Sequence, residues 1–200
     1  MFDRSLLAPA RLEFVVVADT HYVIDVGDVP LEFESRRVQG IRADTAWQAI
    51  SALEPEFVVH MGDLVQEFPG RPNYKRAVHE AVLQIEKAGL ADHCRFVVGN
   101  HDVGDKPDST MPTHPVSAAE LEGWHDRHGP SWRSWEAGGI RFISLNSQIL
   151  NTDMVEATQQ RAWFEACLAD LGDRAGVLFI HLPPYLRDPQ EPHRGHYDNI

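Results

Sequence analysis

Four short apolar segments of this chain each run directly into side chains that bind metals. The segments cover residues 12–18, 57–60, 95–98 and 176–180, and their β-branched and aromatic residues are typical of buried strands. The polar residues that follow these segments are Asp19, His21, Asp63, Asn100, His101, Asp102 and His181. Because ligands of open α/β sheets gather beyond the carboxyl ends of the strands, we expect these side chains to converge on one site.

Helical patterns alternate with the apolar segments. Residues 37–53 predict a helix, with Ile41 and Leu53 among the residues at helical spacing. Further helices are expected at residues 74–88, 118–127 and 158–171. Two apolar runs around Gly138-Gly139 predict a β-hairpin over residues 131–145. The alternation predicts an α/β fold, and the hairpin adds antiparallel strands, so mixed β-sheets are expected.

The charge balance limits the partners of this chain. Its 200 residues include 18 Lys and Arg against 30 Asp and Glu, which gives a net charge of −12. Such acidity argues against non-specific nucleic-acid or anionic-membrane binding, because both need clustered basic residues.

No apolar run approaches the ~20 residues of a membrane span or suits a secretory leader, so a cytoplasmic location is expected by default. Cys94 and Cys167 form no metal-binding or disulfide pattern and are expected to be buried free thiols.

The side chains at the strand ends suit a particular class of metal. Carboxylate, amide and imidazole ligands without cysteine favour Mn, Fe, Zn or Co over a structural thiolate zinc. A carboxylate can bridge two cations about 3.5–4 Å apart, the spacing found in two-metal hydrolases. Bound cations would also supply the positive charge for a phosphate substrate that an acidic chain otherwise lacks.

The order of the motifs resembles that of the calcineurin-like metallophosphoesterases. The matching motifs are DxH at Asp19-Thr20-His21, GD at Gly62-Asp63, GNHD at residues 99–102 and a lone His181. The resemblance covers roughly residues 12–182. It implies an αββα sandwich of mixed β-sheets flanked by helices. It also implies hydrolysis of phosphomonoester or phosphodiester bonds by in-line attack of a metal-bound hydroxide.

The resemblance also implies a role for each site residue. Asp19 and His21 would ligate the first of two divalent or mixed-valence metal ions, and Asp63 would bridge to the second. Asn100 and His181 would ligate the second ion. His101 would act beside the phosphate as a general acid or charge stabiliser, with Asp102 orienting its ring. Substrate-binding residues, the substrate itself and the oligomeric state are left open.

One family motif has no counterpart here. The GHxH segment that ends the family's site is absent, since Gly195-His196-Tyr197-Asp198 lacks the second histidine. We therefore expect residues 1–200 to be a single phosphoesterase domain that is incomplete at its C-terminus. An alternative is a non-catalytic or weakly active remnant, or a binding module, of the same fold. A third possibility is that another chain completes the site.

Other segments carry weaker predictions. Asn146-Ser147-Gln148, followed by Gln160 and Trp163, resembles the NSQ and QxxW segments of some calcineurin-like proteins with proposed protein-phosphatase activity. Structural or solvent-exposed roles are predicted for several further residues: Trp132 and Trp135 in hydrophobic packing, His60 beside the GD turn, His193 and His196 at the surface, and Asp25, Asp28, Glu32 and Glu34 in a solvated loop.

Overall fold

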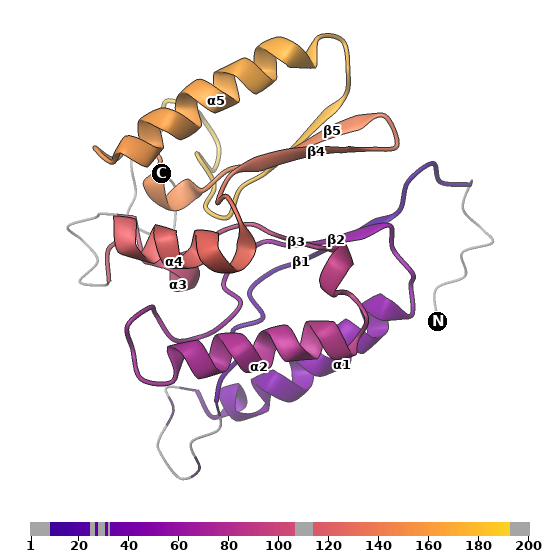
Figure 1. Cartoon of the computed structure of the whole chain (residues 1–200), viewed down its shortest axis with the longest axis vertical. Helices are drawn as coiled ribbons and strands as arrows, with labels where there is room; N and C mark the ends of the chain where they lie inside the picture. Colours follow the sequence, from indigo (N-terminus) through magenta and orange to yellow (C-terminus); the bar gives the residue numbers. More distant parts are fainter. Residues whose placement is uncertain (1–8, 25–26, 28–30, 32, 107–113, 193–200) are drawn as a thin grey trace.

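The computed structural model describes residues 9–24, 27, 31, 33–106 and 114–192, and it contains two three-stranded β-sheets stacked between helices (Figure 1). In Figure 1 helices α1 and α2 cover one side of the stack and helix α5 covers the other. The predicted αββα sandwich is therefore confirmed. Gly195-His196-Tyr197-Asp198, His193, Asp25, Asp28 and Glu32 lie outside the described residues.

The first sheet contains the strands that lead into the DxH, GD and GNHD motifs. Its order is β1 (Phe14–Val17), β2 (Phe57–His60) and β3 (Cys94–Phe96), and neighbouring strands are parallel. Parallel strands need crossover connections, which helices α1 (Gln39–Ser51) and α2 (Tyr74–Lys87) supply. All three strands therefore end at the same edge of the sheet, as the sequence pattern predicted.

The second sheet is mixed. Strands β4 (Arg133–Ala137) and β5 (Ile140–Ser144) form the predicted antiparallel hairpin, while β6 (Gly176–Phe179) pairs with β5 in parallel. Helix α5 (Val155–Leu171) connects β5 to β6. Mixed pairing was expected of the sheets generally, but within the described strands only this sheet shows it, because the hairpin lies wholly within it.

Short elements link the two sheets. Helix α3 (Asn100–Val103) begins within the GNHD motif, and helix α4 (Ala118–His128) precedes the hairpin. Three 3-10 helices are also present: η2 (Glu34–Val38) before α1, η3 (Ala91–His93) before β3, and η4 (Ser147–Ile149) after β5. Helix α4 starts with a Ser117 cap, whose hydroxyl accepts the Glu120 N–H.

Aromatic side chains fill the space between the sheets. Phe142 is fully buried, and its ring centroid lies 5.1 Å from that of Phe57 and 5.5 Å from that of Trp135. Phe14 and Phe179 complete this cluster from the edge strands. The hydrophobic packing predicted for Trp135 is therefore confirmed, with its ring half-buried, and the aromatic cluster joins the two sheets into one hydrophobic unit.

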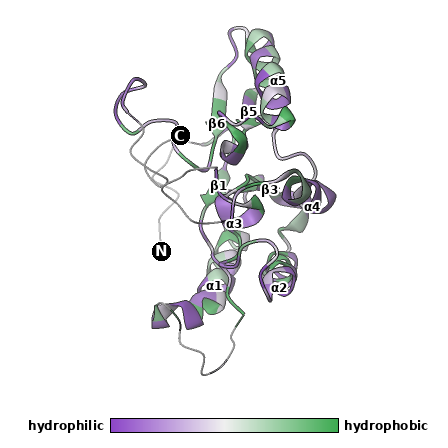
Figure 2. Cartoon of the chain, turned by 90° about the vertical axis from the view of Figure 1, so that its left-hand side faces the viewer, coloured by the Kyte–Doolittle hydropathy of each residue, from purple (hydrophilic) through white to green (hydrophobic). Residues whose placement is uncertain are grey.

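Helix α1 packs on the first sheet through residues other than those that the sequence pattern singled out. Its buried stripe consists of Ala43, Trp47 and Ile50, whereas Ile41 is 68% exposed and Leu53, which follows the helix, is 46% exposed. Trp47 packs on His60 and sets the orientation of the helix. Hydrophilic residues alternate with hydrophobic ones along the helices in Figure 2, as expected for helices with one buried face.

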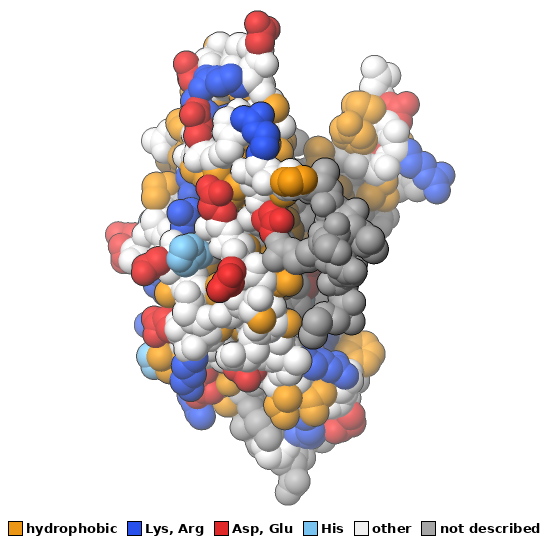
Figure 3. All heavy atoms as spheres, turned by 90° about the vertical axis from the view of Figure 1, so that its right-hand side faces the viewer, with side chains coloured by type: hydrophobic (Ala, Val, Ile, Leu, Met, Phe, Trp, Pro, Cys, Tyr) orange, Lys and Arg blue, Asp and Glu red, His pale blue; other side chains and the backbone are white. Residues whose placement is uncertain are grey.

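The structure also describes the two cysteines, the apolarity of the helices and the charge on one face. Cys94 and Cys167 are buried free thiols, as expected. Within the described residues, the helices lack the length and apolarity that a bilayer crossing requires. On the face shown in Figure 3, acidic side chains are scattered among basic ones, and no broad basic patch is visible there.

Candidate metal centre

The loops that carry the site residues are held side by side by backbone hydrogen bonds. The N–H of Asp19 donates to Gly62 O at 3.1 Å, and the N–H of His21 donates to Asp63 O at 3.0 Å. Asp19, His21 and Asp63 all have left-handed backbone conformations, with φ values of 54°, 42° and 57°. Non-glycine residues rarely adopt this conformation, and such strain concentrates at functional sites.

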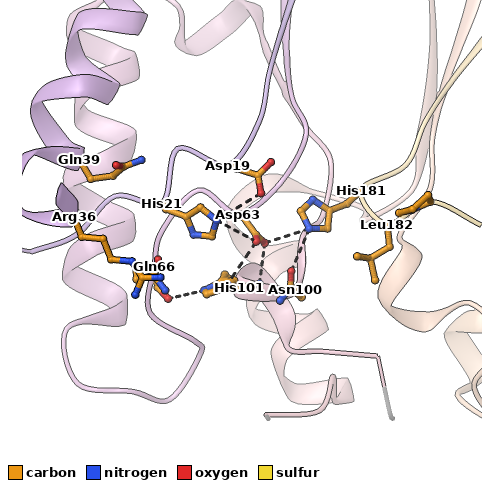
Figure 4. Close-up of a pocket in the computed structure, with 11 residues that line it drawn as sticks. Asp19, His21, Arg36, Gln39, Asp63, Gln66, Asn100, His101, His181 and Leu182 are labelled. Carbon is orange, nitrogen blue, oxygen red and sulfur yellow. Dashed lines mark hydrogen bonds and ion pairs between the residues drawn. The ribbon is translucent and has the colours of Figure 1, made fainter. Parts of the chain in front are cut away.

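Asp63 lies at the centre of the site and is almost completely buried (Figure 4). Its Oδ2 lies 3.6 Å from His21 Nε2 and 3.9 Å from His101 Nε2, whereas its Oδ1 lies 3.6 Å from His181 Nε2. Asp19 Oδ1 is 3.5 Å from His21 Nε2. The two oxygens of one carboxylate thus face different histidines, Oδ2 facing His21 and His101 and Oδ1 facing His181.

The geometry around His181 fits a cation. Its Nδ1 is 2.8 Å from the carbonyl oxygen of Met61, which can only accept, so Nδ1 carries a proton, and Nε2 is an acceptor whenever the ring is neutral. That Nε2 lies 3.2 Å from Asn100 Oδ1. The amide of Asn100 donates to Asp105 through Nδ2 at 2.9 Å, so its Oδ1 is also an acceptor. Two acceptors this close repel each other unless a cation, either a bound metal ion or a proton on Nε2, lies between them.

His21 and Asp63 give two further signs that the residues fit a metal. The Nδ1 of His21 is buried without a hydrogen-bond partner. Two groups of ligand atoms each fall within 4.8 Å of one another, and both contain Asp63: one with His21 and His101, the other with Asp19 and His181. The donor set is all nitrogen and oxygen, which suits Mn, Fe, Zn or Co.

Burial changes the acidity of the central groups. Desolvation, reinforced by the charge of Asp102, raises the pKa of Asp63 to about 9. By contrast, a hydrogen bond from His21 lowers the pKa of Asp19. Ionisation of Asp63 is unfavourable at this buried position without a nearby positive charge. A cation bound there would therefore displace the proton of the Asp63 carboxyl group.

His101 is fixed by residues of the loop that follows the GD motif. Its Nδ1 lies against the carbonyl oxygen of Gln66, and its ring stacks on Phe68 with centroids 4.2 Å apart. Burial, followed by the charge of His21, lowers the pKa of His101 to about 4. The ring is therefore neutral near pH 7, with Nδ1 protonated and Nε2 facing Asp63.

The orienting role predicted for Asp102 does not agree with its contacts. Its Oδ2 accepts the N–H groups of Asp63 at 2.9 Å and Gly99 at 2.8 Å, and its Oδ1 accepts that of Leu64 at 3.3 Å. The ring of His101 is instead fixed by Gln66 and Phe68. Asp102 is buried and joins the GD loop to the GNHD loop, because its carboxylate can accept several backbone bonds at once.

The glycines of both motifs are required by close packing. A Cβ on Gly99 would lie 2.2 Å from Asp63 Oδ1, and a Cβ on Gly62 would lie 2.5 Å from Gly99 N and 2.8 Å from His181 Nδ1. Either side chain would occupy the space of the ligands. Gly62 and Gly99 therefore allow the two loops and His181 to meet.

The site opens into a pocket of about 490 Å³. Six of the seven residues predicted from the sequence line it, namely Asp19, His21, Asp63, Asn100, His101 and His181, and Asp102 lies behind them. Arg36, Gln39 and Gln66 form further parts of the wall. Nothing in the local sequence marked these three residues, since they lie in a 3-10 helix, a helix start and a loop without a motif.

Sequence reasoning also missed Asp105, which is buried and orients Asn100. Its position after GNHD, with three residues between it and His101, was the available signal.

His60, in contrast, does not line the pocket. It is fully buried, lies 3.0 Å from Thr20 Oγ1 through Nε2, and has a pKa that burial lowers to about 3, which agrees with the predicted structural role.

Comparison with known proteins assigns this arrangement to a family. The profile described as calcineurin-like phosphoesterase matches residues 12–199. The chain is 34% identical over 153 residues to the serine/threonine-protein phosphatase CPPED1 of Bos taurus, covering 72% of this chain and 46% of the relative. The CPPED1 of Danio rerio is 31% identical over 158 residues, covering 73% and 47%. The chain thus spans about half the length of the curated relatives it matches.

A solved structure supports the fold. A dimetal phosphatase from Danio rerio superposes with a TM-score of 0.55 at 16% identity, covering 87% of this chain and 70% of that one. At this level of identity the likeness concerns the arrangement of sheets and helices.

Proposed function

Because the chain belongs to the calcineurin-like phosphoesterase family, we propose that it is a phosphoesterase with a two-metal centre. Asp19 and His21 would hold one ion, Asn100 and His181 the other, and Asp63 would bridge them. The observation that carries this proposal is the placement of Asp63, whose Oδ2 and Oδ1 each lie 3.6 Å from a different histidine Nε2. The ions, when bound, supply Lewis-acid activation of water and offset the charge that develops on the phosphoryl group.

His101 is proposed to handle a proton at the leaving-group oxygen. Its Nε2 points into the pocket, while the Gln66 carbonyl and the Phe68 ring hold the imidazole in place. The neutral ring carries no proton on Nε2 until an anion lies next to it. A phosphate ester entering the pocket would favour protonation at that nitrogen, which then stabilises or protonates the departing alkoxide.

Arg36 is proposed to contact the phosphate from the opposite wall. Among the pocket-lining residues that the structure describes, it is the sole lysine or arginine. Its side chain is half-buried and its guanidinium lies 5.0 Å from the centre of the Phe33 ring, which limits its freedom. A planar guanidinium is suited to two oxygens of a phosphate group.

The proposed substrate is a phosphomonoester on serine or threonine. The name of the CPPED1 relatives, serine/threonine-protein phosphatases, supports this class. The pocket supports it as well, because a monoester dianion leaves free oxygens for Arg36 after the others contact the metals. A chromogenic monoester, a chromogenic diester and a phosphoserine peptide should therefore be compared side by side.

Replacement of Asp63 tests the proposed function. With Mn²⁺, the wild-type protein should hydrolyse the chromogenic monoester, and Asp63→Ala should lose more than the ~10- to 100-fold that removal of an outer-sphere partner costs. Asp173→Ala, at an exposed carboxylate outside the pocket, is the matched control and should keep wild-type activity. Persistence of activity in Asp63→Ala would exclude this mechanism.

A further inference from the structure

A cluster of fully buried polar side chains lies behind the pocket. It comprises Asn146, Ser147, Gln148 and Gln160, each with no exposed surface. Burying polar groups is unfavourable unless they form hydrogen bonds, and each of the four side chains forms at least one, although Asn146 Nδ2 has no partner. It lies where β5 leads into η4, between the second sheet and the site.

Ser147 contacts the chain directly after His181. Its Oγ accepts the N–H of Leu182 at 3.1 Å. The same oxygen accepts a bond from Gln148 Nε2 at 3.2 Å. Because Leu182 follows His181, this hydroxyl fixes the turn on which the histidine ring is carried.

Gln148 contacts the chain that orients Asn100. Its Oε1 accepts the N–H of Lys106 at 3.1 Å, and Lys106 directly follows Asp105. Asp105 Oδ1 in turn accepts Asn100 Nδ2 at 2.9 Å, which turns Asn100 Oδ1 toward His181. The side chains of Ser147 and Gln148 thus form one continuous link between two segments that come from different sheets.

We propose that Ser147 and Gln148 are positioning residues that set the separation of Asn100 and His181. The inference rests on the proposed function, in which Asn100 and His181 hold one metal ion. The ligands of the first sheet are held by backbone bonds between neighbouring loops, whereas His181 reaches the site from the second sheet. A buried polar link across the two sheets fixes a distance that hydrophobic packing alone would leave adjustable.

Gln160 anchors the link to helix α5. Its Oε1 accepts the Asn146 N–H at 2.8 Å, and its Nε2 donates to the Asn146 carbonyl oxygen at 3.0 Å. Asn146 Oδ1 then accepts the Gln148 N–H at 2.9 Å. The NSQ and QxxW segments noted in the sequence are therefore parts of one hydrogen-bonded unit.

Metal titration provides the first test. Ser147→Ala and Gln148→Met should weaken the second of two Mn²⁺-binding steps by about tenfold or more, as loss of outer-sphere partners does, and leave the other step within about twofold. Ile85 is buried on helix α2, and Ile85→Ala is the control for general destabilisation. It should not weaken one Mn²⁺-binding step more than the other. Equal weakening of both steps in the cluster variants would overturn the proposal.

Histidine ring spectra of the metal-free protein provide the second test. The ¹⁵N signals of the His181 ring should shift in Ser147→Ala and Gln148→Met, while those of His21 stay as in the wild type. Unchanged His181 signals in both variants would overturn the positioning role. A wild-type protein that binds fewer than two ions would contradict the proposed function instead, and the ring spectra would still decide the inference.

Discussion

The first sheet supplies five of the six predicted residues that line the pocket, whereas the second sheet supplies only His181. The first-sheet residues follow three parallel strands, and their loops are joined by backbone bonds and by the carboxylate of Asp102. His181 reaches the same point from the other sheet and contacts Met61 O and Asn100 Oδ1. The site is therefore built across the interface of two sheets, and its geometry depends on how they are held together.

The comparison predicts that the one site residue from the second sheet, His181, matters as much as a site residue from the first. His181→Ala and His21→Ala should each lower kcat/KM by more than about 100-fold, because each removes a proposed metal ligand beside Asp63. Steady-state hydrolysis of the chromogenic monoester with Mn²⁺ measures both. His79→Ala, at an exposed histidine on α2, is the control. Nearly full activity in His181→Ala would show that the first sheet alone forms the site.

A smaller effect is expected at the wall of the pocket. Arg36→Gln should raise KM about tenfold with little change in kcat, because it removes a charge-assisted contact to the phosphate. Arg42→Gln, at an exposed arginine of α1 outside the pocket, should leave both constants unchanged. A drop in kcat with constant KM would place Arg36 in the chemical step rather than in binding.

The smallest effect concerns stability of the metal-free protein. The pKa of Asp63 is raised from 3.8 to about 9, so its contribution to stability is lost as the pH rises through that interval. Asn has no such group, so the gain in Tm of Asp63→Asn over wild type should be greater near about pH 8 than near about pH 5. Thermal unfolding with a chelator measures this gain, and Asp173→Asn is the exposed control. A gain that is independent of pH would contradict the buried, protonated state of Asp63.

The two sheets also differ in what the sequence could predict. The site residues of the first sheet follow apolar segments as short motifs, so Asp19, Asp63 and Asn100 could be placed from strand periodicity and motif order. His181 also follows an apolar segment, but as a lone histidine without a motif of its own. Ser147 and Gln148 were noted as a motif without a role, because hydrogen bonds between distant segments leave no periodic pattern.

Other misses have similar physical reasons. Asp102 was expected to contact His101, its neighbour in sequence, but its carboxylate turns to the backbone N–H groups of the facing loop. In α1 both stripes have helical spacing, and the large buried side chain of Trp47 decides which one faces the sheet. Arg36 lines the pocket because η2 lies beside it. No local sequence pattern predicts the position of η2 relative to the site.

Anomalous scattering from crystals soaked in Mn²⁺ would test the bridging role of Asp63 most directly. We predict two peaks on either side of the Asp63 carboxylate, about 3.5–4 Å apart, one next to His21 and the other next to His181. A single peak, or two peaks that do not share Asp63, would contradict the two-metal centre.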